Sequence, residues 1–199
     1  MQQEGHTTIA PEQQYRANVY RLLAALLRDV PAEPVLAYAR QLADMSAGGD
    51  ALATALVGLG LAARHTDPLA IDDEFHALFI GLGRGEIVPY GSWYLTGFLM
   101  EKPLGLLRQE LAALGFERDP TVKEPEDHVA ALCEVMAMLI ETDVAFARQA
   151  QFFNQHLTSW QERFYQDLQQ APSAAFYQTV AQLGVSFIRF EQQYFSIQR

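Results

Sequence analysis

Apolar residues of this chain recur mainly at steps of three and four, which is the spacing of a single helix face. The clearest run lies near the end of the chain and consists of Phe176, Val180, Leu183, Phe187, Phe190 and Tyr194. Such a sustained aromatic-rich seam is typical of a helix that packs in a core. We therefore predict a helix over residues 173–195. The same spacing predicts another over residues 13–30, closed by Pro31.

Proline, glycine and acidic residues mark the ends of further predicted helices over residues 34–45, 50–64, 67–79 and 103–114. Gly115 is expected directly after the last of these, where glycine commonly ends a helix. The turn at residues 89–91 precedes a short predicted helix that Ser92 can cap. No segment predicts a hairpin. The sequence therefore predicts an all-α protein, a single bundle of about nine or ten helices.

One long helix is predicted from Pro125 to about Ala150. Proline suits the first turn of a helix, and the acidic residues around it complement the partial positive charge there. This prediction places Asp127 and His128 in the first turn. A charged, ionisable pair at such a position is typical either of a binding site or of simple helix capping, and both interpretations remain open.

Residues 116–123 show no periodicity and contain Asp119-Pro120, which makes them the best candidate for a linker or hinge. We therefore predict two helical lobes, over residues 1–115 and 125–199, joined by a hinge at 116–124. Exchange of a lobe between two copies would start at such a hinge. The expected state is a monomer or a domain-swapped dimer.

Charge and composition narrow the function classes. The 199 residues include 24 acidic and 14 basic ones, for a net charge of −10, and half of the chain is hydrophobic. This composition is that of a folded globular protein, and the absence of Lys/Arg clusters argues against nucleic-acid binding. No apolar stretch reaches membrane-spanning length, and residues 1–11 lack the pattern of a secretory signal. We expect a cytoplasmic protein without stable membrane insertion.

Candidate catalytic and metal-binding patterns are weak. Asp73-x-x-His76 is the nearest approach to a di-iron ligand motif, but it has no second copy. Cys133 is the single cysteine and lies in an apolar run, where a buried, inert thiol is expected. The GLGRG loop at residues 81–85 lacks the Lys-Ser/Thr pair of a phosphate-binding loop. We expect no catalytic site, metal or cofactor. A helical metal-dependent oxidoreductase remains the alternative.

A binding function is better supported, by the segment from residue 74 to residue 100. The carboxylates of Glu74 and Glu86, with those of Asp72 and Asp73 directly before the segment, accompany a high density of apolar and aromatic residues on turns. An apolar surface rimmed by carboxylates suits an amphipathic ligand with a positively charged end. That the aromatic residues simply fill the core remains the other interpretation.

Three motifs occur in order: FHALFIG at residues 75–81, PYGSWYL at 89–95 and EPEDH at 124–128. Together they resemble the TorD/DmsD family of cytoplasmic redox-enzyme maturation chaperones, and the similarity extends over about residues 15–195. The resemblance implies an all-helical protein without a catalytic site. It also implies that the protein binds the twin-arginine leader and the body of a molybdopterin-containing oxidoreductase. The chaperone would hold this client until the cofactor has been inserted. A nitrate-reductase-type assembly chaperone, whose client lacks such a leader, is the related alternative.

The resemblance places the leader-binding positions of the family at Leu78, Phe79, Pro89, Tyr90, Asp127 and His128. Tyr90 departs from relatives that carry tryptophan there. The carboxylates of Glu124 and Glu126 match the fork of an arginine, and Trp93 extends the apolar surface. His128, near the positive end of a helix, is expected to favour its neutral form. Reductases of dimethyl sulfoxide or trimethylamine N-oxide and formate dehydrogenase are all compatible clients.

Overall fold

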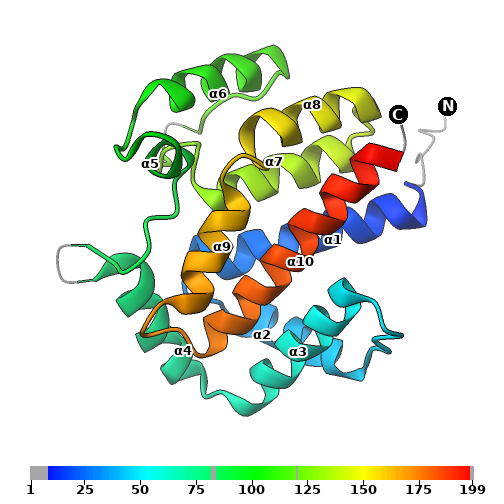
Figure 1. The fold of residues 1–199 in the computed structure, drawn as a ribbon, viewed down its shortest axis with the longest axis vertical. Coiled ribbons are helices and arrows are strands. Elements are labelled where there is room, and N and C mark those ends of the chain that lie inside the picture. The colour runs from blue at the N-terminus through cyan, green and yellow to red at the C-terminus, as the bar shows by residue number, and fades with distance from the viewer. Residues whose placement is uncertain (1–8, 82–83, 120, 198–199) are drawn as a thin grey trace, which may run out of the picture.

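The computed structural model describes residues 9–81, 84–119 and 121–197, and these form the predicted all-α bundle (Figure 1). Gly83 of the glycine loop and Pro120 of the predicted hinge lie outside the described residues. Within the described ranges, two short helices, η1 (Leu42–Asp44) and the π-helical η2 (His76–Ile80), accompany ten α-helices. The ten are α1 (Pro11–Arg28), α2 (Glu33–Gln41), α3 (Ala51–His65), α4 (Pro68–Phe75), α5 (Gly91–Thr96), α6 (Lys102–Ala113), α7 (Val129–Glu141), α8 (Phe146–His156), α9 (Gln161–Gln170) and α10 (Phe176–Ile197).

Helices that are distant in the sequence form the core. α1 packs along α7, and α10 packs against both α9 and α3, while α5, α6 and α8 lie together at one end (Figure 1). The predicted seam of α10 is confirmed, because four of its six residues are buried and the other two are half-buried. Each pair α1–α7 and α3–α10 joins residues from the two sides of the predicted hinge at 116–124. The division into two lobes stays a prediction.

A buried ion pair ties α1 to α10. The Arg16 Nε lies 2.6 Å from a carboxylate oxygen of Glu191, and neither side chain has exposed surface. The hydroxyl of Tyr20 also donates a hydrogen bond to Glu191, at 2.9 Å, and Arg16 donates another to Gln149 of α8 at 3.1 Å. Because desolvated charges require close partners, this network fixes the relative positions of three helices.

The single long helix predicted over residues 125–150 is wrong at its C-terminal half. α7 ends at Glu141, and α8 begins only at Phe146. Between them Asp143 adopts a left-handed conformation with φ 54°, and the N–H of Val144 donates to the carbonyl of Leu139 at 3.0 Å. Aspartate tolerates this conformation better than most residues, so no glycine marks the break in the sequence.

The predicted start of that helix is also wrong. The N–H of His128 donates to the carbonyl of Pro125 at 3.2 Å, which forms a turn before the helix. His128 itself is the N-cap of α7, and its Nδ1 accepts a hydrogen bond from the N–H of Ala130 at 3.2 Å. Asp127 and His128 therefore precede the first helical turn. The capping interpretation holds for His128.

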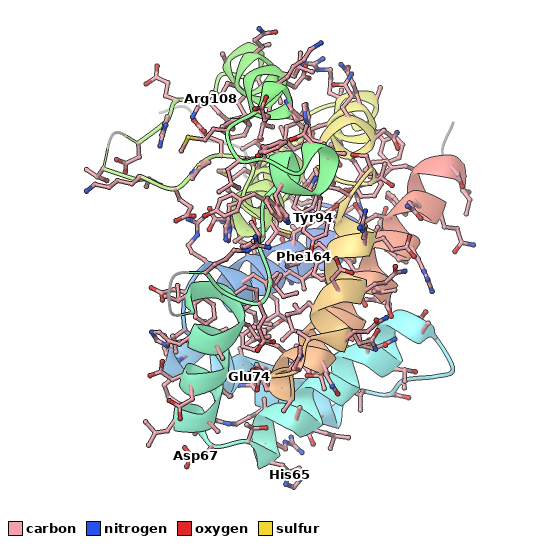
Figure 2. All side chains as sticks on the ribbon, turned by 60° about the vertical axis from the view of Figure 1, so that its left-hand side comes forward. His65, Asp67, Glu74, Tyr94, Arg108 and Phe164 are labelled. Atoms are coloured by element: carbon pink, nitrogen blue, oxygen red, sulfur yellow. The ribbon has the colours of Figure 1, made fainter. Side chains whose placement is uncertain are left out.

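Two of the four carboxylates predicted to surround a ligand surface instead accept hydrogen bonds from residues near the start of α10. Glu74 is buried, and its carboxylate accepts the backbone N–H groups of Ala175, Phe176 and Tyr177 at 2.8, 3.0 and 2.7 Å (Figure 2). Glu86 accepts from the backbone and the hydroxyl of Ser173. Both side chains thus supply acceptors to the unpaired N–H groups where α10 begins.

Candidate functional site

Backbone hydrogen bonds bring the second and third motifs together. The carbonyl of Pro89 accepts from Val129, and the N–H of Gly91 donates to the carbonyl of Asp127, each at 2.9 Å. Between these bonds Tyr90 and His128 form an isolated antiparallel bridge, the only β pairing among the residues described. The carboxylate of Asp127 then accepts the N–H of Ser92 at 2.7 Å. The motifs therefore hold α5 against the start of α7.

A cleft of about 660 Å³ opens beside this junction. We call it the α5–α6 cleft, because residues of those two helices form most of its wall. The start of α7, the end of α8 and the residue before α9 complete it. It is lined by Gly91, Ser92, Leu95, Thr96, Lys102, Pro103, Leu106, Leu107, Gln109, Glu110, Asp127, Leu132, Gln155, His156 and Trp160. A largely apolar cleft with a few polar groups is the usual form of a ligand site.

Unpaired polar atoms lie in the wall of the α5–α6 cleft. Asp127 is only 3% exposed, and while its Oδ2 accepts from Ser92, its Oδ1 has no hydrogen-bond partner among the described residues. The Oγ of Ser92 and the Nε2 of His156 are likewise without partners there. A buried carboxylate oxygen without a donor is costly, so a cationic donor that entered the cleft would be stabilised by Asp127.

Trp160 lines the cleft, and other aromatic rings pack against it from outside the lining. The indole of Trp160 stacks on Tyr94 with ring centroids 5.6 Å apart, and Tyr94 in turn meets Phe164 edge-on at 6.0 Å (Figure 2). The indole N–H donates to the carbonyl of His156 at 2.7 Å. A Cβ at Gly91 would lie 3.1 Å from the Trp160 Nε1, so glycine allows α5 to approach this ring closely.

Three of the predicted leader-binding residues lie away from the α5–α6 cleft, in or against the core. Leu78 has no exposed surface, and Pro89 is also buried. Phe79 is half-buried and packs against Phe75 and Tyr177, with ring centroids 4.9 and 5.4 Å away. Leu78 and Pro89 are thus buried in this structure, and their contacts to a leader stay a prediction.

The predicted aromatic contacts Tyr90 and Trp93 are half-buried and lie outside the lining of the cleft. The ring of Tyr90 meets the imidazole of His128 edge-on at 5.1 Å. The guanidinium of Arg84 lies 4.4 Å from the ring centroid of Trp93, in a cation–π contact. One arginine of the chain itself thus already covers a predicted contact surface.

Glu124 and Glu126 line a second, smaller groove of about 350 Å³ between α6, α7 and residues 116–119 and 122–126. Glu126 lies 2.8 Å from the guanidinium of Arg108 (labelled in Figure 2) and 3.6 Å from that of Arg118. Burial, the largest single effect, raises the pKa of Glu126, but the hydrogen bond from Arg108, a backbone hydrogen bond and the charges of Arg108 and Arg118 together lower the pKa overall. Partial desolvation raises the pKa of Glu124. Asp127 is the predicted acid that reaches the α5–α6 cleft.

His128 is neutral, as predicted, but mainly for a different reason. Burial lowers the pKa of this imidazole to about 4, and the positive charge of Arg28 adds to the effect. The folded protein thus resists protonation that the unfolded chain accepts near the ordinary value of 6.5. Stability from neutral His128 is complete above that value and is lost as the pH falls towards 4.

We expect replacement of His128 with asparagine to remove this pH dependence. Asparagine also caps helices but does not titrate in this range. Between pH 6.5 and 4 the wild-type free energy of unfolding should fall more steeply than that of the variant, by at most about 1.4 kcal/mol per pH unit. Urea denaturation across this range measures both slopes. Equal slopes for the wild type and the variant would contradict the attribution of this pH dependence to His128.

Sequence reasoning did not identify most of the cleft lining, notably Leu95, Leu106, Glu110, His156 and Trp160. Two signals were present. Leu95 belongs to an uncharged run over residues 87–100, and His156 and Trp160 are four residues apart, which is one helical turn. Neither signal shows that α6 and α8 converge on α5, because that convergence depends on tertiary packing.

The sequence model of the family described as "Nitrate reductase delta subunit" matches residues 42–166, well over half of the chain. The chain belongs to this family. Several curated relatives carry the name "Chaperone protein TorD", which confirms the resemblance to the TorD/DmsD family. The one from Vibrio parahaemolyticus is 29% identical over 143 residues, which cover 66% of each chain, just under two thirds. The one from Vibrio atlanticus is 28% identical over 146 residues, 67% of this chain and 68% of the relative.

The fold is similar to a solved structure described as a redox enzyme maturation protein from Archaeoglobus fulgidus, with a TM-score of 0.58 and 19% identity. The match covers 96% of this chain and 99% of the other, and it confirms the fold class. Within residues 9–81, 84–119 and 121–197, no three His, Cys, Asp or Glu side chains are grouped as metal ligands. Across the same residues, no helix is both long and apolar enough to cross a membrane.

Proposed function

We propose that this protein is a cytoplasmic, non-enzymatic chaperone for a molybdenum- or tungsten-containing oxidoreductase. It binds the twin-arginine leader of the client and holds the precursor until the cofactor is inserted. Family membership and relatives named as chaperones support this class of function. They do not favour the alternative of a metal-dependent oxidoreductase.

The single observation that carries the proposal is the buried carboxylate of Asp127, a residue that lines the α5–α6 cleft and whose Oδ1 has no hydrogen-bond partner among the described residues. A guanidinium donates several hydrogen bonds, and it suits a carboxylate in a partly apolar site better than a strongly hydrated ammonium does. Ser92 places a second unpaired acceptor in the same wall. An arginine of the leader would therefore satisfy acceptors that the fold leaves without donors.

The test is calorimetry with a synthetic leader peptide that carries two arginines followed by an apolar stretch. We expect Asp127→Asn to weaken binding by about 10- to 100-fold, because a charge-assisted hydrogen bond contributes about 1.5–3 kcal/mol. Asparagine keeps one oxygen for the N–H of Ser92, so α5 should keep its cap. Circular dichroism and thermal unfolding check that the variant remains folded.

The matched control is Glu33→Gln, which removes one charge from an exposed residue of α2 at the other end of the molecule. The affinity of this variant for the leader peptide should stay within about twofold of that of the wild type. Two results would overturn the proposal: no binding of the leader, or full binding after both arginines become alanine. The second result would instead favour the nitrate-reductase-type assembly chaperone, which the description of the family suggests.

A further inference from the structure

A group of exposed apolar side chains lies on α5, on the connection that follows it and on α6. Leu95, Phe98, Leu99, Met100 and Leu106 are each between 45 and 72% exposed. Twelve large apolar residues are exposed in the described part of the chain, and these five lie within a segment of twelve residues. Isolated exposed apolar residues are ordinary, but a contiguous group marks an interaction surface. We call this group the α5–α6 strip.

The strip continues into the α5–α6 cleft. Leu95 and Leu106 belong to both, since they line the cleft and also expose about half of their surface. Between them the chain turns through Gly97 and Met100, both with positive φ, and carries Phe98 and Leu99 on the turn. One continuous surface thus has buried acceptors at the Asp127 end and apolar side chains beyond.

We propose that the α5–α6 strip binds the apolar stretch that follows the arginines of a leader peptide. This inference rests on the proposed function and adds a direction: the arginines lie at Asp127, and the apolar residues extend outward over residues 95–106. Charge complementarity selects this occupant, because a cationic group next to an apolar segment matches acceptors next to an apolar strip. A second copy of the chain fits less well, since each copy has a net charge of −10.

The experiment compares two peptides by calorimetry: a complete leader, and a version in which glycine and serine replace the apolar stretch. In the double variant Phe98→Ser/Met100→Ser, we expect at least tenfold weaker binding of the complete leader and less than a twofold change for the truncated one. The matched control is Leu69→Ser on α4, because Leu69 and Met100 are both 72% exposed. This control should leave the affinity for both peptides unchanged.

The direction in which the leader peptide lies on this surface is tested separately, with a photo-crosslinking residue in the apolar stretch of the peptide. Crosslinks to residues 95–106 are expected, and crosslinks confined to other segments would overturn the inference. Equal effects of the double variant on both peptides would also overturn it. So would light scattering that shows self-association of the wild type and its loss in the double variant.

Failure of this inference is distinguishable from failure of the proposed function. If the wild type binds the leader through Asp127 but the strip variant binds equally well, the inference alone is wrong. If the wild type does not bind the leader, both are wrong. Since Phe98 and Met100 are exposed, their replacement with serine should preserve the fold, and circular dichroism confirms this in either case.

Discussion

Replacement of Glu191 with leucine is expected to lower the free energy of unfolding by about 3–5 kcal/mol. The change leaves the guanidinium of Arg16 buried without a counter-charge and removes the acceptor for the hydroxyl of Tyr20. Nearby rings do not compensate, although Arg16 lies 4.4 Å from the ring centroid of Tyr194. Denaturation with guanidinium chloride, followed by circular dichroism, measures the loss.

Two further variants distinguish the cost of an unpaired buried charge from the stabilisation that an ion pair itself provides. The double variant Arg16→Met/Glu191→Leu removes both charges, and it should recover much of the lost stability because no unpaired ion remains. Arg189→Ala breaks an ion pair with Glu162 in which the arginine is 61% exposed, and it should cost less than about 1 kcal/mol. A loss at Glu191 no larger than that at Arg189 would contradict the structural role of the buried pair.

Replacement of Glu74 with alanine is expected to destabilise the protein by about 2–3 kcal/mol, because it leaves backbone donors without acceptors at the start of the long central helix α10. Three N–H groups from residues 175–177 donate to this carboxylate, and two of these three bonds involve buried residues. The prediction is checked by chemical denaturation. Hydrogen exchange at residues 175–177 should increase as well, since their amides lose their partner.

Glu86→Ala is the matched control, because the carboxylate of Glu86 also serves the segment before α10 but remains exposed. Its replacement should cost less than about 1 kcal/mol, since water can satisfy the groups that it leaves. If both variants lose equal stability, the capping role of Glu74 is wrong. If Glu74→Ala is stable but loses leader binding, the original interpretation of Glu74 as part of an acidic rim regains support.

Most residues of the three sequence motifs support the fold. The first packs Leu78 and Phe79 towards the core, and parts of the second and third pair through the backbone to position α5. Asp127 differs, because one carboxylate oxygen holds Ser92 and the other faces no donor among the described residues. The same side chain therefore supports the fold, and we propose that it also offers a charge to a ligand.

The sequence by itself determined the helical class, the core seam of α10 and the membership in the family. These properties follow from local spacing and from motifs that are contiguous along the chain. It also predicted the neutral form of His128, which the lowered pKa of its imidazole supports. The lobes, the hinge at 116–124 and the contacts to a leader remain predictions.

Only the tertiary structure decided which carboxylates have an oxygen without a hydrogen-bond partner among the described residues. Glu74 and Asp127 are both acids within sequence motifs or beside them, yet Glu74 is fully used by amides about one hundred positions later in the chain. The break at Asp143 and the convergence of α6 and α8 on α5 also left no periodic signal. The physical reason is that helix formation depends on neighbouring residues, whereas burial and hydrogen-bond partners depend on segments that meet only in the folded protein.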